Sequence, residues 1–154
     1  MTAGTLALSP FEGPVWRLLA ASVAEQAPLA PAAAPEGRFH HSGQTAIYAS
    51  LSILGTRIAI QRYLSDDVPR VLVPMWLSAA HVVDMRGARA ASVVWQDIRA
   101  AGDPSPTWSL SDAARQAGAQ AMLYSSRSRP ELAHVVVFDP QCLRCVGPAS
   151  VFTP

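Results

Sequence analysis

The feature that most constrains the fold is the distribution of apolar residues in short runs. None of these runs reaches 18 residues, so a membrane-spanning helix is not expected. Segments rich in helix and strand breakers separate the runs, above all the Pro/Ala-rich stretch 27–37 and the sequence GDPSPT at 102–107. Because strand-like and helix-like runs alternate irregularly, the pattern favours an α+β fold over a doubly wound parallel sheet.

The runs can be assigned to individual elements. We expect strands at 15–19, 46–51, 70–77, 120–124 and 134–139, and helices at 52–64, at 95–101 and from Ser109 or Ser111 to Gln116. Pro74 interrupts the third strand and predicts an edge or a bulge there. Gly118 is expected to end the last helix. All 154 residues fit a single domain, with a core at about 15–140.

Composition excludes several classes of function. The net charge is +1, with no block of one sign, which argues against a broad nucleic-acid surface. The N-terminus lacks the basic start of a signal peptide, so a soluble, cytoplasmic protein without a membrane partner is expected. No metal is expected either, because the four histidines do not fall at a metal-binding spacing. Cys142 and Cys145 form a lone CxxC that predicts two ordinary reduced thiols.

Known catalytic motifs are missing, and what remains is a set of polar side chains at strand ends. The sequence has no GxGxxG, no GxxxxGK[ST] and no GxSxG. Arg38 precedes a strand, Tyr48 lies within it, and Ser126 ends another strand. Arginine pairs with phosphate and tyrosine offers a stacking face, so this set suits an anionic ligand with rings. His40 and His41 are predicted to be loop histidines, with a general base as the alternative.

A helical wheel of residues 52–64 adds two candidates. Ile53, Leu54, Ile58, Ile60 and Leu64 span one apolar arc, and Arg57 and Gln61 point into its middle. Polar groups on a buried arc either find hydrogen-bond partners or line a cavity. The wheel leaves both possibilities open.

Three segments, in this order, resemble the RES-domain family. GRFHHSGQTAIYAS (37–50) is similar to the family signature, with Arg38, Phe39 and Tyr48 at its arginine, aromatic and tyrosine positions. AMLYSSRSRPELAHVVVFDP (121–140) resembles the second block, with Ser126 at its serine position. VWRLL (15–19) resembles the opening strand, which often carries an arginine, here Arg17.

The resemblance implies a fold, an activity and a partner. The fold would be a mixed sheet with flanking helices, as in ADP-ribosyltransferase toxins. The protein would be a toxin paired with an Xre-like antitoxin, and it would consume NAD+ by passing ADP-ribose to phosphate, water or a protein. Arg38 would hold the pyrophosphate, Tyr48 would pack near the nicotinamide ribose, and Ser126 would orient the substrate. Arg17 and Arg57 would complete the NAD+ site.

One position departs from the family. Its members carry a glutamate on the helix after the tyrosine, whereas this chain has none between Tyr48 and Leu64, and Gln61 is the nearest match. A carboxylate stabilises the cation that develops on the ribose better than an amide does. The change predicts altered acceptor chemistry, with protein as the favoured acceptor, a slower enzyme, or an inactive binding module. Without the resemblance, a small α+β enzyme acting on a phosphorylated metabolite is the further alternative.

Overall fold

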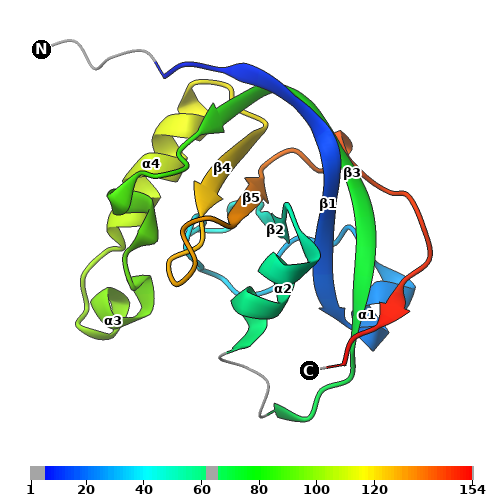
Figure 1. Cartoon of the computed structure of the whole chain (residues 1–154). Coiled ribbons are helices and arrows are strands. Elements are labelled where there is room, and N and C mark those ends of the chain that lie inside the picture. Colours follow the sequence, from blue (N-terminus) through cyan, green and yellow to red (C-terminus); the bar gives the residue numbers. More distant parts are fainter. Residues whose placement is uncertain (1–5, 62–65, 154) are drawn as a thin grey trace, which may run out of the picture.

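The computed structural model describes residues 6–61 and 66–153. In chain order the elements are β1 (Ser9–Ala20), α1 (Ala21–Gln26), β2 (Ile47–Ser50), α2 (Ile53–Ile60), β3 (Arg70–Asp84), η2 (Arg89–Ser92), α3 (Trp95–Ala100), α4 (Pro106–Gln116), β4 (Ala121–Ser125), β5 (Ala133–Val137), η3 (Pro140–Cys142), β6 (Leu143–Cys145) and β7 (Ser150–Val151). A mixed sheet flanked by short helices confirms the α+β prediction (Figure 1).

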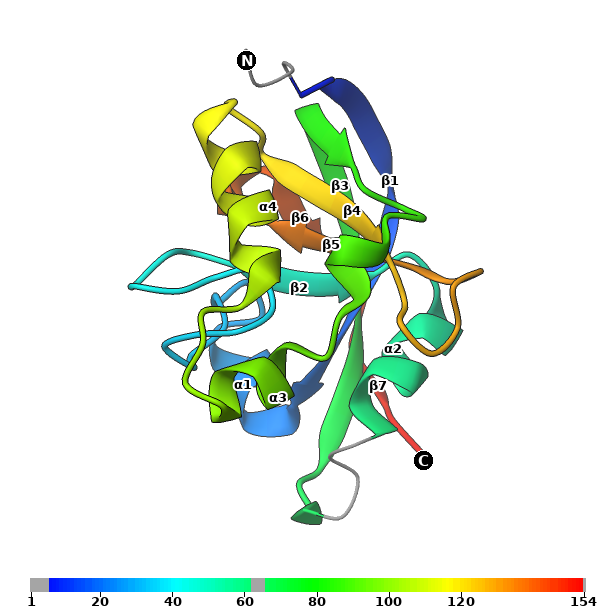
Figure 2. The same ribbon diagram turned by 90° about the vertical axis from the view of Figure 1, so that its left-hand side faces the viewer.

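The strands pair in a ring. The order β1-β2-β5-β4-β3 returns to β1, because β3 also pairs with β1 over most of its length. Only β3 and β4 run parallel, and the other pairs are antiparallel. The contact that closes the ring between β1 and β2 is one residue pair, Trp16 with Ser50. The sheet therefore curls strongly, as Figure 2 shows.

The two longest strands extend beyond their predicted limits. β1 begins at Ser9 and β3 continues to Asp84, because each supplies the other's hydrogen-bonding partner. Pro74 marks no bulge, because β3 pairs with β1 without a register shift around it, but one side of the strand is unpaired at this position, as predicted for an edge. Pro74 pairs with Trp16 on one side, and on the other it lies between the residues paired to β7 and those paired to β6. Its missing N–H is tolerated at that break, where its carbonyl accepts from the Val146 N–H at 3.2 Å.

Residues alternate between the two faces of the sheet and build two cores. One face contributes Val15, Ile47, Met75, Leu123 and Val135 to the larger core. On the other face, Met122, Tyr124 and Val136 pack with Phe39 from the loop before β2 and with Ala114 of α4. In Figure 2, α4 lies across this second face. The helix thereby presses the loop that contains Arg38 and His40 onto the sheet.

Helix α4 differs from the sequence prediction at its start. α4 begins at Pro106, where the Ser105 hydroxyl accepts from the Thr107 N–H, and not at Ser109 or Ser111. It ends as expected, before Gly118 in the left-handed region (φ +87°). Among the described residues, no helix has the length and apolar character needed to cross a bilayer.

Candidate active site

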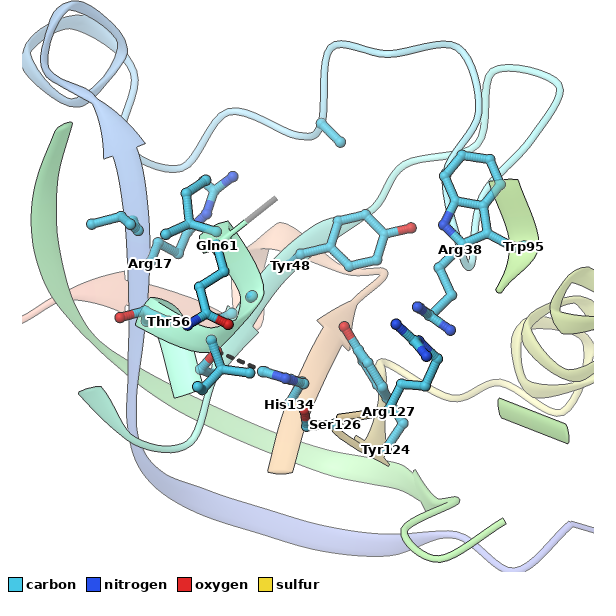
Figure 3. Close-up of a pocket in the computed structure, with 18 of the residues that line it drawn as sticks. Arg17, Arg38, Tyr48, Thr56, Gln61, Trp95, Tyr124, Ser126, Arg127 and His134 are labelled. Atoms are coloured by element: carbon cyan, nitrogen blue, oxygen red, sulfur yellow. Dashed lines mark hydrogen bonds between the residues drawn. The ribbon is translucent and has the colours of Figure 1, made fainter. Parts of the chain in front are cut away.

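A cavity of about 560 Å³ opens between the loop before β2, helix α2 and the ends of β4 and β5 (Figure 3). That volume lies in the range of sites that hold cofactors and other small molecules. Five of the six side chains predicted from sequence line it, namely Arg17, Arg38, Tyr48, Gln61 and Ser126. The fold thus brings together residues that lie more than a hundred positions apart in the chain.

One side of the cavity is the loop 36–40, which we call the clamped wall because α4 holds its backbone. Trp108 Nε1 donates to the Gly37 carbonyl at 2.8 Å, and the Thr107 hydroxyl donates to the carbonyl of Arg38. Arg115 donates to the Phe39 carbonyl at 2.9 Å. Since successive carbonyls each have a side-chain donor, the loop is held in one conformation although it belongs to no strand or helix.

The clamped wall directs Arg38 into the cavity. Its Nη1 donates to the carbonyls of Ala91 and Val93, at 3.2 and 2.8 Å. Figure 3 shows the guanidinium groups of Arg38 and Arg127 pointing towards the same part of the cavity, close to Tyr124. Two guanidinium groups converging on one space produce a positive potential that suits an anionic ligand such as a pyrophosphate.

Two buried tyrosines lie beside this positive region. Burial raises the pKa of Tyr48 to about 12, against smaller lowering effects of the Phe39 N–H and of nearby Arg115 and Arg38. Burial also raises the pKa of Tyr124, again with Arg38 acting in the opposite direction. Both phenols are therefore neutral at physiological pH. They offer aromatic faces and hydroxyl groups to a ligand, not negative charge.

The floor of the cavity carries a buried histidine. His134 Nδ1 lies 2.7 Å from the Ser50 hydroxyl, and both residues line the cavity. Burial, and then the charge of Arg38, lower the pKa of His134 to about 4. The imidazole is therefore neutral at physiological pH, where it can act as a hydrogen-bonding group.

The opposite side, which we call the helix wall, is residues 58–61 at the end of α2. The side chain of Gln61 lines the cavity and is exposed to solvent. The prediction that Arg57 also faces the site is wrong: Arg57 is exposed, donates to the Thr153 carbonyl at 3.1 Å and lies over the Phe152 ring. The wheel misplaced it because α2 packs through Gly55 and Thr56, which leaves Ile53 and Leu54 about half exposed. The expected end of this helix at Leu64 lies outside the described residues.

Arg17 and Ser126 line the cavity but also hold the backbone. Arg17 is 7% exposed, and its Nη1 donates to the carbonyls of Pro28 and Ala30 at 2.7 and 3.0 Å. Burial lowers the pKa of Arg17 to about 10, so the group stays charged at neutral pH. Arg17 therefore anchors the Pro/Ala-rich loop. The Ser126 hydroxyl accepts from the Arg129 N–H at 3.3 Å, as expected of a turn residue.

Several residues that line the cavity were not predicted as site residues from sequence. His40, predicted to be a loop histidine, is 2% exposed and bonded to Tyr48. Trp95, Arg127 and His134 also line the cavity. Arg127 could have been found from its place beside Ser126, since strand ends often carry functional side chains. No local signal marks Trp95 or His134, because their positions depend on how distant elements pack.

Carboxylates are scarce around the cavity. Among its described lining residues Glu36 is the only one, and its Oε1 accepts from Arg99 Nε at 3.0 Å. Within residues 6–61 and 66–153, no group of three or more His, Cys, Asp or Glu side chains is placed to hold a metal ion. What the site provides chemically is positive charge, aromatic surface and neutral hydrogen-bonding groups.

Comparison with known proteins identifies the class. Residues 14–153 match the RES domain, so the chain belongs to the RES-domain family. Its fold is similar to that of a chain in the crystal structure of the M. tuberculosis MbcT–MbcA toxin–antitoxin complex, with a TM-score of 0.65 and 15% sequence identity. The match covers 95% of this chain and 87% of the other. No curated protein sequence matches the chain.

Proposed function

We propose that this chain is the toxin of a toxin–antitoxin module and that it consumes NAD+ as a substrate. The observation that carries the proposal is the gathering of Arg17, Arg38, Tyr48, Gln61 and Ser126 around one cavity in a RES domain. The family resemblance assigns Arg17, Arg38, Tyr48 and Ser126 to NAD+, and Gln61 is the nearest match to the family glutamate. The likeness to a chain of the MbcT–MbcA toxin–antitoxin complex supports the toxin assignment.

In this proposal the positive end of the cavity binds the pyrophosphate. Arg38 and Arg127 supply charge and hydrogen-bond donors there, and Arg38 is already oriented by the Ala91 and Val93 carbonyls. Tyr48 and Tyr124 pack against the ribose and the rings of the substrate. Ser126 orients the substrate at the end of β4.

The reaction is a transfer of ADP-ribose. The bond between the ribose C1′ and the nicotinamide nitrogen breaks, and its electron pair leaves with nicotinamide. A lone pair of the acceptor, which is water, phosphate or a side chain of another protein, forms the new bond to C1′, and the acceptor's proton goes to solvent. Positive charge develops on the ribose in the transition state, so a nearby carboxylate accelerates the reaction more than an amide does.

A glutamine at position 61 should affect both the rate of ADP-ribose transfer and the choice of acceptor. It lies on the helix wall, where the family glutamate is expected, and its amide can hydrogen-bond a ribose hydroxyl. Without a carboxylate on this wall, stabilisation of the ribose cation falls more heavily on the acceptor itself. This favours a positioned side chain of a protein acceptor over water.

Release of nicotinamide from NAD+ by the purified chain tests the enzymatic proposal. The reaction is followed with and without phosphate, and with cell extract as a source of protein acceptors. Radioactive label passing from NAD+ to a protein band would identify protein as the acceptor. No nicotinamide under any of these conditions would contradict the proposed activity.

A second candidate function follows from the same glutamine. A RES fold without catalytic power could serve as a binding module. The exposed Gln61 favours it, together with the ion pairing of Glu36, the one carboxylate among the described residues that line the cavity. Arg38→Ala separates the two. If expression of the wild-type chain arrests growth and that of the variant does not, the toxicity depends on the cavity. If both arrest growth equally, NAD+ chemistry is not the cause.

The proposed partner is an Xre-like antitoxin that covers the mouth of the cavity. Co-expression with the product of an adjacent gene, if that gene encodes a helix-turn-helix protein, should restore growth. A tagged copy of the chain should also retain that product during purification. Growth arrest that persists despite co-expression, with no protein retained, would contradict the pairing.

A further inference from the structure

The side chain of His40, a residue of the clamped wall, is enclosed between Gly37 and Tyr48. It is 2% exposed, with Nδ1 2.7 Å from the Tyr48 hydroxyl and Nε2 2.9 Å from the Ala34 carbonyl. The space for its ring exists because residue 37 is glycine. A Cβ atom at Gly37 would lie 2.4 Å from His40 Cε1. His40 is therefore a tightly packed part of the site.

The partners of the imidazole decide where its hydrogen lies. The Ala34 carbonyl can only accept, so Nε2 must carry the hydrogen. A neutral imidazole with a hydrogen on Nε2 has a bare Nδ1, which can only accept. The Tyr48 hydroxyl consequently donates its one hydrogen to His40 Nδ1. The same oxygen accepts from the Phe39 N–H at 2.9 Å.

This arrangement limits what Tyr48 can do for a ligand. Its hydroxyl hydrogen is committed to His40, so Tyr48 has none to donate into the cavity. The oxygen keeps accepting capacity beyond its bond from Phe39. Only a ligand group that carries a hydrogen can bond to it.

We propose that His40 is a positioning residue that fixes the Tyr48 hydroxyl as a hydrogen-bond acceptor towards the substrate. This inference rests on the proposed function, because it takes the substrate to be NAD+. The donor is then a hydroxyl of the ribose on the nicotinamide side, next to the bond that breaks. Without His40 the hydroxyl hydrogen of Tyr48 is free to point towards the substrate. Tyr48 can then donate as well as accept, so it no longer favours a substrate group that donates a hydrogen bond.

The first test does not depend on NAD+ at all. The full chain is labelled with 15N in its histidines, and its imidazole signals are recorded by NMR in mildly alkaline buffer, with those of His40 assigned by their loss in His40→Asn. We expect hydrogen on Nε2 and none on Nδ1. Tyr48→Phe should shift the Nδ1 signal and leave Nε2 almost unchanged. Hydrogen on Nδ1, or an Nδ1 signal indifferent to Tyr48→Phe, would overturn the proposal.

The second test measures nicotinamide release by His40 variants. His40→Leu removes the acceptor for Tyr48 and should lower kcat/KM about tenfold, the equivalent of one hydrogen bond. His40→Asn places an amide oxygen near the position of Nδ1 and should lose less. The two variants are first matched by far-UV circular dichroism and urea unfolding. Equal losses in folded His40→Leu and His40→Asn would contradict the positioning role.

Substrate choice provides a readout that packing alone does not change. Wild-type chain should prefer NAD+ over an analogue lacking a hydroxyl on the nicotinamide-side ribose, and His40→Leu should show a smaller preference. An unchanged preference for every such analogue would overturn the proposed contact. If the wild-type chain releases no nicotinamide, the proposed function fails, while the NMR result still decides the role of His40.

Discussion

The two walls of the cavity are built by opposite means. The clamped wall has no regular secondary structure, yet α4 provides donors for three successive carbonyls, from residue 37 to residue 39. The helix wall is the end of a regular helix, but that helix, α2, is capped by the Ser52 hydroxyl, presents Ile53 and Leu54 to solvent and is followed by an exposed Gln61. Fixed geometry in this site therefore comes from hydrogen bonds to the loop backbone, not from the helix.

The difference assigns separate tasks to the walls. A loop in which three successive carbonyls are bonded to side chains keeps its side chains within narrow limits, which suits the recognition of a charged, directional group. A helix end with exposed side chains can accept changes at little cost in stability. We therefore expect substitutions in the clamped wall to have large effects, and substitutions in the helix wall to change the rate or acceptor without unfolding the protein.

The sharpest contrast is between Arg38 on the clamped wall and Arg57, which lies on α2 but does not line the cavity. Arg38→Ala should lower kcat/KM for nicotinamide release about a thousandfold, because it removes a preorganised cation from the site of negative charge. Arg57→Ala is the matched control and should leave the rate unchanged, since Arg57 contacts the C-terminal segment instead. Steady-state kinetics on both variants measures the contrast. Equal losses would contradict the placement of Arg38 in the cavity and of Arg57 outside it.

Acidification should destabilise the folded protein through His134, which lies on the floor of the cavity. His134 has a pKa of about 4 when folded and an ordinary value near 6.5 when unfolded, so the unfolded state binds a proton first as pH falls. The contribution of His134 to the free energy of unfolding is therefore fully present above about pH 6.5. It declines by roughly 3 kcal/mol as the pH falls towards 4. Urea unfolding across this range measures the decline. In His134→Asn the decline should be flatter, and an unchanged slope would show that other groups cause it.

Gly37 in the clamped wall and Gly55 in helix α2 give a comparison of packing. Gly37→Ala should destabilise the protein by about 2 kcal/mol, because the new methyl group would displace the His40 ring. At Gly55 an added Cβ would lie 3.0 Å from Ser50 Cβ, a smaller conflict. There the gain in helix propensity, about 1 kcal/mol, offsets part of the cost. The midpoints of urea unfolding should therefore rank Gly55→Ala above Gly37→Ala, and the reverse order would contradict the comparison.

The smallest predicted effect is a gain. Gln61→Glu restores the carboxylate of the family to the helix wall and should raise the rate of nicotinamide release about tenfold. Stability should change by less than about 0.5 kcal/mol, because the side chain is exposed. Gln61→Ala is the control that removes the amide without adding charge. A rate for Gln61→Glu no higher than that of Gln61→Ala would exclude this position as the site of ribose-cation stabilisation.

How far the sequence could predict these features depended on the distance between interacting residues. Arg38 and Tyr48 lie ten positions apart on one loop and strand, so a local pattern was enough to propose both. His40 was predicted to be a loop residue because its burial depends on α4, where Trp108 contacts the loop across 71 positions. Arg57 was misplaced because periodicity gives the relative directions of side chains on a helix, but not which side packs on the sheet. The start of β1 could not be predicted from local sequence either. Its residues from Ser9 to Pro14 form a strand because they pair with β3, which is distant in the sequence.

The ring of strands also determines the order in which strand pairs can form while the chain is synthesised. β1 closes against β3, about sixty positions later in the chain, and β2 has no antiparallel neighbour other than a single pair in β1 until β5 is made. Ser126 and His134, which belong to the cavity, are made more than a hundred positions after Arg17, which lines the same cavity. A chain interrupted before β5 lacks the floor of the site and cannot bind the substrate there. If the protein is a toxin, as proposed, prematurely terminated copies are harmless to the cell that makes them.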